Sequence, residues 1–187
     1  MKKILILATM AASLSAHAVV IDFESLTVTN GWAQTYSSYS ESGFDFVSSG
    51  GGFAVWATDN TSGYYPGSTA LFNNGGGSNT TMSKTGGGGF DVGSIQLCNA
   101  YRDTTAQTIL FTGTRADTSQ VFNSFTLTDP ANMHTFAFTG MTNIVTLDWL
   151  QNSPYHQFDN INTAVPEPAT LSALAIGGLA LLLRKRK

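Results

Sequence analysis

The chain has 187 residues, of which 42% are hydrophobic and 11% are charged, and most of its nine basic residues lie near the two ends. Between Val19 and Val165 three basic residues face eleven acidic ones, a net charge of −8. Three scattered cations cannot form a phosphate-binding surface, which excludes nucleic acid as a partner. The single cysteine, Cys98, cannot form an intramolecular disulfide, and the apolar residues before it predict a buried side chain.

The first residues have the three parts of a secretory signal. Lys2 and Lys3 precede an apolar stretch over residues 4–14, and small residues stand at Ala16 and Ala18. We expect a signal helix in residues 1–18, export by the general secretion machinery, and cleavage by signal peptidase after Ala18.

Residues 19–164 read as a β-rich domain. They contain short β-branched and aromatic runs separated by Gly, Ser, Thr and Asn, with no long helical periodicity. Because each strand has one apolar face to bury, eleven runs predict an all-β fold of two antiparallel sheets packed as a sandwich. The expected strands span residues 20–23, 43–48, 52–58, 69–73, 80–85, 90–101, 107–114, 120–127, 134–138, 143–151 and 156–161.

Alternation within these runs predicts the core. It assigns Phe44, Phe46, Phe136, Phe138, Val145, Leu147 and Trp149 to the buried face. The glycine run 86–89 is expected to be a turn or bulge, because it lacks the Lys-Ser/Thr ending and the following helix of a phosphate-binding loop.

The C-terminal residues predict a sorting tail. Val165, Pro166, Glu167 and Pro168 open a motif over residues 165–170, followed by an apolar helix over 171–183 and a basic cluster over 184–187. A helix over residues 169–183 covers about 22 Å, less than the roughly 30 Å of a bilayer core, which suits a temporary transmembrane anchor with its basic end in the cytoplasm. The alternative, a buried core helix, leaves the prolines unexplained.

This tail resembles the PEP-CTERM sorting signal, which is recognised by an exosortase. The resemblance covers residues 165–187 and includes the motif, the short apolar helix and the basic terminus in order. It implies a Gram-negative host that secretes exopolysaccharide, removal of the tail by exosortase, and delivery to the cell surface or the extracellular matrix, with a possible biofilm role.

The middle resembles jelly-roll domains of carbohydrate-binding modules and other galactose-binding-like sandwiches, through the blocks 21–24, 41–46, 89–95 and 158–161. That resemblance implies a structural Ca²⁺ site where the first and last strands meet. The matching positions are Asp22, Glu24 and Asp159, with Asn160 as a further oxygen donor. The alternative is that these acids are solvated or hydrogen-bonded to loop backbone.

Exposed aromatic rings would bind a sugar such as the host's exopolysaccharide. The first candidates are Trp56, Tyr64 and Tyr65, then Tyr101 and Tyr155, whereas Trp32 and Trp149 could equally be core.

No motif favours an enzyme. His134 and His156 stand outside any nucleophile or metal motif and are expected on strand edges or in loops. The sequence therefore predicts a non-enzymatic exported protein that binds carbohydrate. A matrix scaffold without sugar specificity is the alternative, and a secreted hydrolase is the less favoured one.

Overall fold

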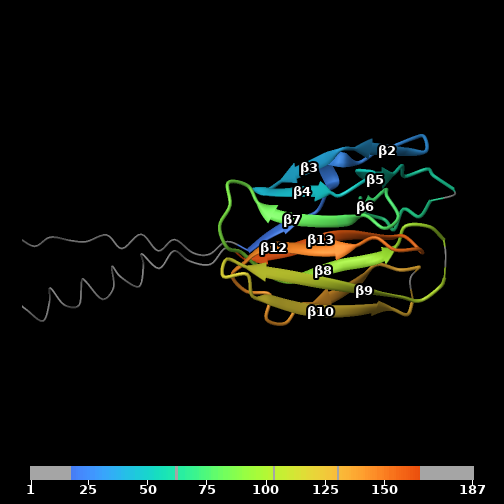
Figure 1. The fold of residues 1–187 in the computed structure, drawn as a ribbon. Helices are drawn as coiled ribbons and strands as arrows, with labels where there is room; N and C mark the ends of the chain where they lie inside the picture. Colours follow the sequence, from blue (N-terminus) through green and yellow to red (C-terminus); the bar gives the residue numbers. More distant parts are fainter. Residues whose placement is uncertain (1–17, 62, 103, 130, 165–187) are drawn as a thin grey trace, which may run out of the picture. The chain divides into compact units, whose positions relative to one another are not determined.

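A computed structural model describes residues 18–61, 63–102, 104–129 and 131–164. In this part of the chain the regular elements are strands and one short 3-10 helix (Figure 1). They are β1 (Ala18–Ile21), η1 (Glu24–Leu26), β2 (Ala33–Tyr36), β3 (Ser38–Glu41), β4 (Phe44–Ser48), β5 (Phe53–Trp56), β6 (Leu71–Asn73), β7 (Asn79–Lys84), β8 (Asp91–Asn99), β9 (Gln107–Arg115), β10 (Gln120–Leu127), β11 (His134–Ala137), β12 (Ile144–Leu150) and β13 (His156–Ala164).

The strands form two antiparallel sheets, which confirms the predicted all-β sandwich. One sheet has the order β11-β8-β13-β6-β5-β2, with β1 also beside β13, and the other has the order β10-β9-β12-β7-β4-β3. Figure 1 shows β2 and β3 together at one border of the sandwich and β10 at the opposite border. The predicted signal and tail helices lie outside the described residues. Within those residues no helix is long and apolar enough to cross a membrane.

The core lies between the sheets and is dominated by aromatic rings. On β4, Phe44 and Phe46 are buried while Asp45 between them is half-buried on the outer face, as alternation requires. The indole of Trp149 packs edge to face against the ring of Phe158, which belongs to the other sheet, and their centroids lie 4.9 Å apart. Such pairs each add about 0.5–1.5 kcal/mol beyond the apolar area that they bury.

Three residues of the predicted core are only partly buried. A register shift between Ile144 and Thr146 interrupts the pairing of β12 with β9, so Ile144 is fully buried and Val145 is not. Strict alternation from Leu147 backwards therefore chose the wrong residue. Phe136 and Phe138 are partly buried and pack against the core at its border.

Two strands were not predicted, and one ends early. The sequences of β2 and β3 are Ala-Gln-Thr-Tyr and Ser-Tyr-Ser-Glu, which lack apolar alternation. The first strand stops at Ile21 because Phe23 has a left-handed backbone (φ 54°) and leads into η1. That turn places the ring of Phe23 in the core, 5.4 Å from Phe46 and 5.6 Å from Phe158.

The last strand is central to its sheet. β13 pairs with β8 along most of its length, with β6 at Phe158, and with β1 from Ile161 to Ala164. Ala18 is paired with Ala164, so the first and last described residues are neighbours in the sheet.

Candidate functional site

The predicted aromatic residues gather at one end of the sandwich, on the outer face of the seven-stranded sheet. Trp56 ends β5 and is only 4% exposed. Its indole stacks on Phe72 at 5.0 Å, and a Cβ added to Gly63 would lie 2.2 Å from the indole. Because both faces are covered, Trp56 cannot itself present a ring to a ligand.

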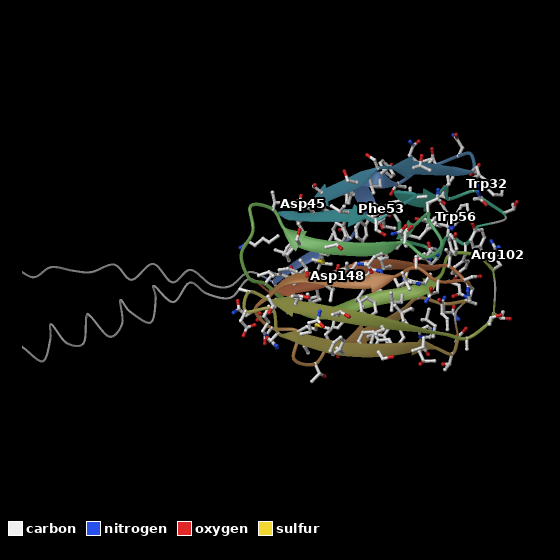
Figure 2. All side chains as sticks on the ribbon, viewed as in Figure 1. Trp32, Asp45, Phe53, Trp56, Arg102 and Asp148 are labelled. Atoms are coloured by element: carbon white, nitrogen blue, oxygen red, sulfur yellow. The ribbon has the colours of Figure 1, made fainter. Side chains whose placement is uncertain are left out.

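The exposed rings stand around this buried indole. Trp32 is 63% exposed and Tyr101 is 39% exposed, and each contacts Trp56 edge to face, at 5.8 and 5.2 Å between centroids. Tyr155 continues the series, 6.0 Å from Tyr101. We call Trp32, Tyr64, Tyr101 and Tyr155 the aromatic surface. Figure 2 shows Trp32, Trp56 and Arg102 together at this end of the domain.

Backbone contacts hold the segments of the aromatic surface together. Gly63 and Tyr101 form a β-bridge, and the amide of Tyr64 donates to the carbonyl of Ala100 at 3.2 Å. The side chain of Gln157 donates to the carbonyls of Tyr64 and Asn99 at 2.8 and 2.9 Å. These bonds fix the positions of three segments that are far apart in the sequence.

The remaining predicted aromatic residues are partly buried. The guanidinium carbon of Arg102 lies 5.8 Å from the centre of the Tyr64 ring, a cation–π distance. Burial raises the pKa of Tyr64, with a further contribution from Cys98. Tyr65 is partly buried beside it.

The sequence did not decide whether Trp32 is a core residue or an exposed one, and in the structure it is the most exposed aromatic residue at this end. The available signal was local. Trp32 follows Asn30-Gly31, a turn dipeptide, and Gly31 has φ 108°. A tryptophan directly after such a turn, before a polar strand, has little core to enter.

The predicted calcium residues meet at the start of η1. The hydroxyl of Ser68 is 2.9 Å from Oε1 of Glu24 and also hydrogen-bonds Oδ2 of Asp159. Oδ1 of Asp22 accepts from the backbone amide of Glu24 at 3.2 Å. Ser68 therefore bridges Glu24 and Asp159, whereas the bond of Asp22 stays within its own turn. In the described segments, no three or more His, Cys, Asp or Glu side chains lie close enough to form a metal site by themselves, so a bound ion would need further ligands.

The pKa values of the two acids that Ser68 bridges, Asp159 and Glu24, are shifted in opposite directions. Asp159 is fully buried, and burial with the charges of Glu24 and Asp22 raises its pKa from 3.8 to about 6. Burial also acts to raise the pKa of Glu24, but hydrogen bonds from the Thr69 amide and from the Ser68, Thr27 and Thr69 hydroxyls outweigh it and lower the value. At neutral pH the cluster is crowded with negative charge.

His156 was expected at a strand edge or in a loop, and this prediction is wrong. Its ring is fully buried at the start of β13, and neither ring nitrogen has a hydrogen-bond partner among the described residues. Burial lowers its pKa from 6.5 to about 3. The indole nitrogen of Trp149 and the side-chain oxygen of Gln151 are also buried, and among the described residues neither has a hydrogen-bond partner. His134 is partly exposed and contacts the carbonyl of Asp129 at 2.7 Å.

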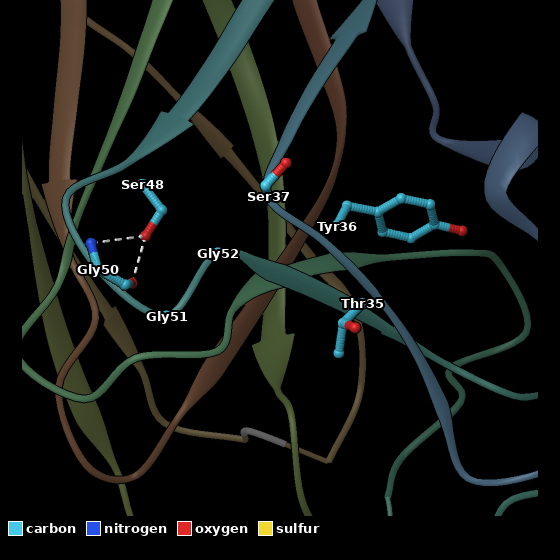
Figure 3. A pocket seen from close by; sticks show the side chains of 7 residues that line it. All are labelled: Thr35, Tyr36, Ser37, Ser48, Gly50, Gly51 and Gly52. Atoms are coloured by element: carbon cyan, nitrogen blue, oxygen red, sulfur yellow. Dashed lines mark hydrogen bonds between the residues drawn. The ribbon is translucent and has the colours of Figure 1, made fainter.

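Two shallow hollows lie elsewhere. One, of about 320 Å³, is lined by residues 35–37, Ser48 and residues 50–52. Figure 3 shows the Ser48 hydroxyl bonded to Gly50, with the Tyr36 ring pointing away from that pair. The other, of about 310 Å³, lies on the outer face of the six-stranded sheet around Asp148. The carboxylate of Asp148 already accepts hydrogen bonds from the side chains of Asn79, Thr81 and Thr146.

Comparison with known families concerns the C-terminal residues. Residues 164–187 match the family described as the PEP-CTERM protein-sorting motif. The chain carries a PEP-CTERM sorting motif. This motif implies exosortase-dependent export and a C-terminal membrane-anchor region, as the sequence predicted. Its first residue, Ala164, is the last residue of β13, so the sorting motif begins where the sheet ends.

No curated protein matches the sequence. Among solved structures, a family 29 carbohydrate-binding module is similar at 12% identity over 80% of this chain and 92% of that chain, with a TM-score of 0.45. A two-module fragment of endo-1,4-beta-D-xylanase 10B from Clostridium thermocellum, complexed with xylohexaose, is similar at 12% identity over 80% and 29%, with a TM-score of 0.45. A family 11 carbohydrate-binding module of a cellulosomal cellulase from the same organism is similar at 10% identity over 81% and 95%, with a TM-score of 0.35. Likeness at these scores carries no argument about function.

Proposed function

We propose that this is a non-catalytic, exosortase-processed protein of the cell surface or extracellular matrix, and that its sandwich binds carbohydrate through the aromatic surface. One observation carries the sugar-binding proposal. Trp32 and Tyr101 are exposed, and edge contacts with a buried indole hold both rings in place.

The chemistry of the aromatic surface suits a sugar. A pyranose has an apolar C–H face that packs on an aromatic ring, and rings already fixed by their neighbours lose little side-chain entropy on binding. The ring contacts extend from Trp32 through Trp56 and Tyr101 to Tyr155, which gives the surface the length of several rings. A polysaccharide is thus favoured over a single sugar. The host's own exopolysaccharide is the ligand that export would place beside the protein.

Binding of the purified protein to immobilised polysaccharides tests this proposal. Trp32→Ala and Tyr101→Ala should each weaken binding at least about tenfold, since an aromatic anchor contributes on the order of 1–3 kcal/mol. Phe122→Ala is the matched control, because that ring is 57% exposed on β10 of the other sheet. If wild-type protein binds no polysaccharide, the sandwich is an exported scaffold instead.

Localisation tests the sorting proposal. In a host strain that lacks exosortase, the protein should stay in the membrane fraction with its tail attached. Release at the wild-type level would show that the sorting motif is not read as proposed.

We also propose that Ca²⁺ neutralises the cluster of Asp22, Glu24 and Asp159. Ser68 bridges the carboxylates of Glu24 and Asp159, and the charges of Glu24 and Asp22 raise the pKa of Asp159, so a cation bound here would relieve their mutual repulsion. Carboxylate and hydroxyl oxygens are suitable Ca²⁺ ligands, and the remaining ligands would be backbone carbonyls or water. Bound calcium would stabilise the folded state by an amount set by its concentration and affinity.

Thermal melting at pH 7 with Ca²⁺ and with a chelator tests this. We expect a higher midpoint with calcium and no such shift in Asp159→Asn. An unchanged wild-type midpoint would mean that a proton, not calcium, relieves the cluster.

A further inference from the structure

The described cations of the domain are placed very unevenly. Lys84 ends β7, where it pairs with Phe44, and Arg115 ends β9, where it pairs with Ile144. Phe44 and Ile144 both contact Phe90, one through its ring and one through a β-bridge, so both cations lie at one end of the sandwich. Arg115 is also occupied, since its guanidinium donates to the carbonyls of Gly140 and Thr142 at 3.0 and 3.2 Å.

Arg102 lies at the other end, on the aromatic surface. It directly follows Tyr101, is exposed, and has its guanidinium over the ring of Tyr64. Figure 2 shows it beside Trp32 and Trp56. A guanidinium that stacks on a ring uses its flat face for that contact and keeps its N–H donors at the edge for another partner. In the described residues no carboxylate lies within ion-pair distance of it.

The donors of a guanidinium form a planar fork that matches a carboxylate, and hydrogen bonds to a charged partner are about twice as strong as neutral ones. We propose that the aromatic surface binds an acidic polysaccharide, in which a sugar packs on Trp32 or Tyr101 and its carboxylate pairs with Arg102. This inference rests on the proposed carbohydrate binding and names the class of sugar.

The negative charge of the domain does not prevent this pairing. At physiological salt the Debye length is about 8 Å, so acids at the far end of the sandwich are largely screened from a ligand here. One acid near this surface is Asp129, whose charge raises the pKa of Tyr64 while that of Arg102 lowers it. Its carboxylate is shared with the side chains of Asn132 at 2.7 Å and His134 at 3.7 Å.

Titration of the purified full chain in detergent with two polymers tests the inference. The probes are polygalacturonate and the same polymer after reduction of its carboxyl groups. Wild-type protein should bind the acidic form more tightly. Arg102→Gln should weaken that binding about tenfold or more and leave binding to the reduced form within about twofold. Lys84→Gln, which removes a cation at the opposite end, should change neither.

The outcomes separate the two proposals. If Trp32→Ala removes binding but Arg102→Gln does not change the preference, carbohydrate binding stands and the role of Arg102 is refuted. Equal or tighter wild-type binding to the reduced polymer refutes the acidic class in the same way. If the wild-type protein binds neither form of the polymer and no other polysaccharide, the proposed function itself is refuted. Unchanged thermal melting of Arg102→Gln will show that any loss is not due to unfolding.

Discussion

Replacing His156 with leucine should change how stability depends on pH. The ring is fully buried, neither nitrogen has a described partner, and burial lowers the pKa of His156 from 6.5 to about 3. Between these values the unfolded chain binds a proton that the folded protein excludes. The contribution of His156 is therefore fully present above pH 6.5 and is lost as the pH falls toward 3.

The size of this effect follows from the gap between the two pKa values. A gap of about 3.5 units, at 1.36 kcal/mol per unit, makes unfolding easier by about 5 kcal/mol at pH 3 than above pH 6.5. Most small domains are stable by only about 5–15 kcal/mol, so this one histidine decides much of the acid sensitivity.

Asp159 acts in the opposite direction. Its pKa is raised from 3.8 to about 6, so between these values the folded state binds the extra proton. Its contribution to the free energy of unfolding is largest below pH 3.8 and falls by about 3 kcal/mol as the pH rises to 6. In the wild-type protein the two slopes should nearly cancel between pH 4 and 6, provided that no calcium occupies the acid cluster.

Urea unfolding followed by tryptophan fluorescence, in calcium-free buffers from pH 3.5 to 7.5, resolves the two residues. His156→Leu should become more stable, by up to about 3 kcal/mol, as the pH falls from 6 to 4, because the contribution of Asp159 then acts without the opposing contribution of His156. Asp159→Asn should lose about 1.4 kcal/mol per pH unit over the same range. His134→Gln, the partly exposed control, should follow the wild type. Parallel curves for His156→Leu and wild type would refute the reasoning.

Three further predictions concern packing. Gly63→Ala should destabilise the domain by about 1–3 kcal/mol in urea unfolding, because its Cβ would lie 2.2 Å from the indole beneath it, whereas Gly93→Ala, whose nearest contact is 3.7 Å, should have little effect. Cys98 is buried with its pKa raised to about 12, so a thiol reagent at pH 8 should react only after unfolding, and rapid reaction with native protein would contradict its burial. Phe46→Ala should lower the free energy of unfolding by about 3–5 kcal/mol and Phe122→Ala by less than about 0.5, and equal losses would mean that the core is misplaced.

Sequence reasoning found the strands whose pattern is set by packing. The expected strand over residues 120–127 has the bounds of β10, and residues 43–48 and 107–114 differ from β4 and β9 by one residue at one end. The expected strand over residues 80–85 is β7 shifted by one residue. These runs have apolar residues on one face and polar breaks at their ends. β2 and β3 were missed because they are polar border strands, and their pairing comes from β5 and β4.

The candidate site could be predicted only in part. The resemblance to jelly-roll domains pointed to Asp22, Glu24 and Asp159, and residue type alone pointed to Trp56 and Tyr64 as aromatic candidates. Sequence could not show that Trp56 is covered while Trp32 is exposed, because that depends on Gly63, which lies on the indole without a side chain. Burial of His156 was also invisible, since it depends on the position of β13 inside the sheet.

The pairing of β1 with β13 has a consequence for the order of events in export. These strands stand at opposite ends of the described sequence, yet Val19, Val20 and Ile21 of β1 pair with residues 161–163 of β13, and β13 also separates β8 from β6. Contacts between such distant residues form slowly, because the whole intervening chain must be ordered first. The sandwich can therefore be completed only once residues 161–164, which run into the sorting motif, are free to pair with β1.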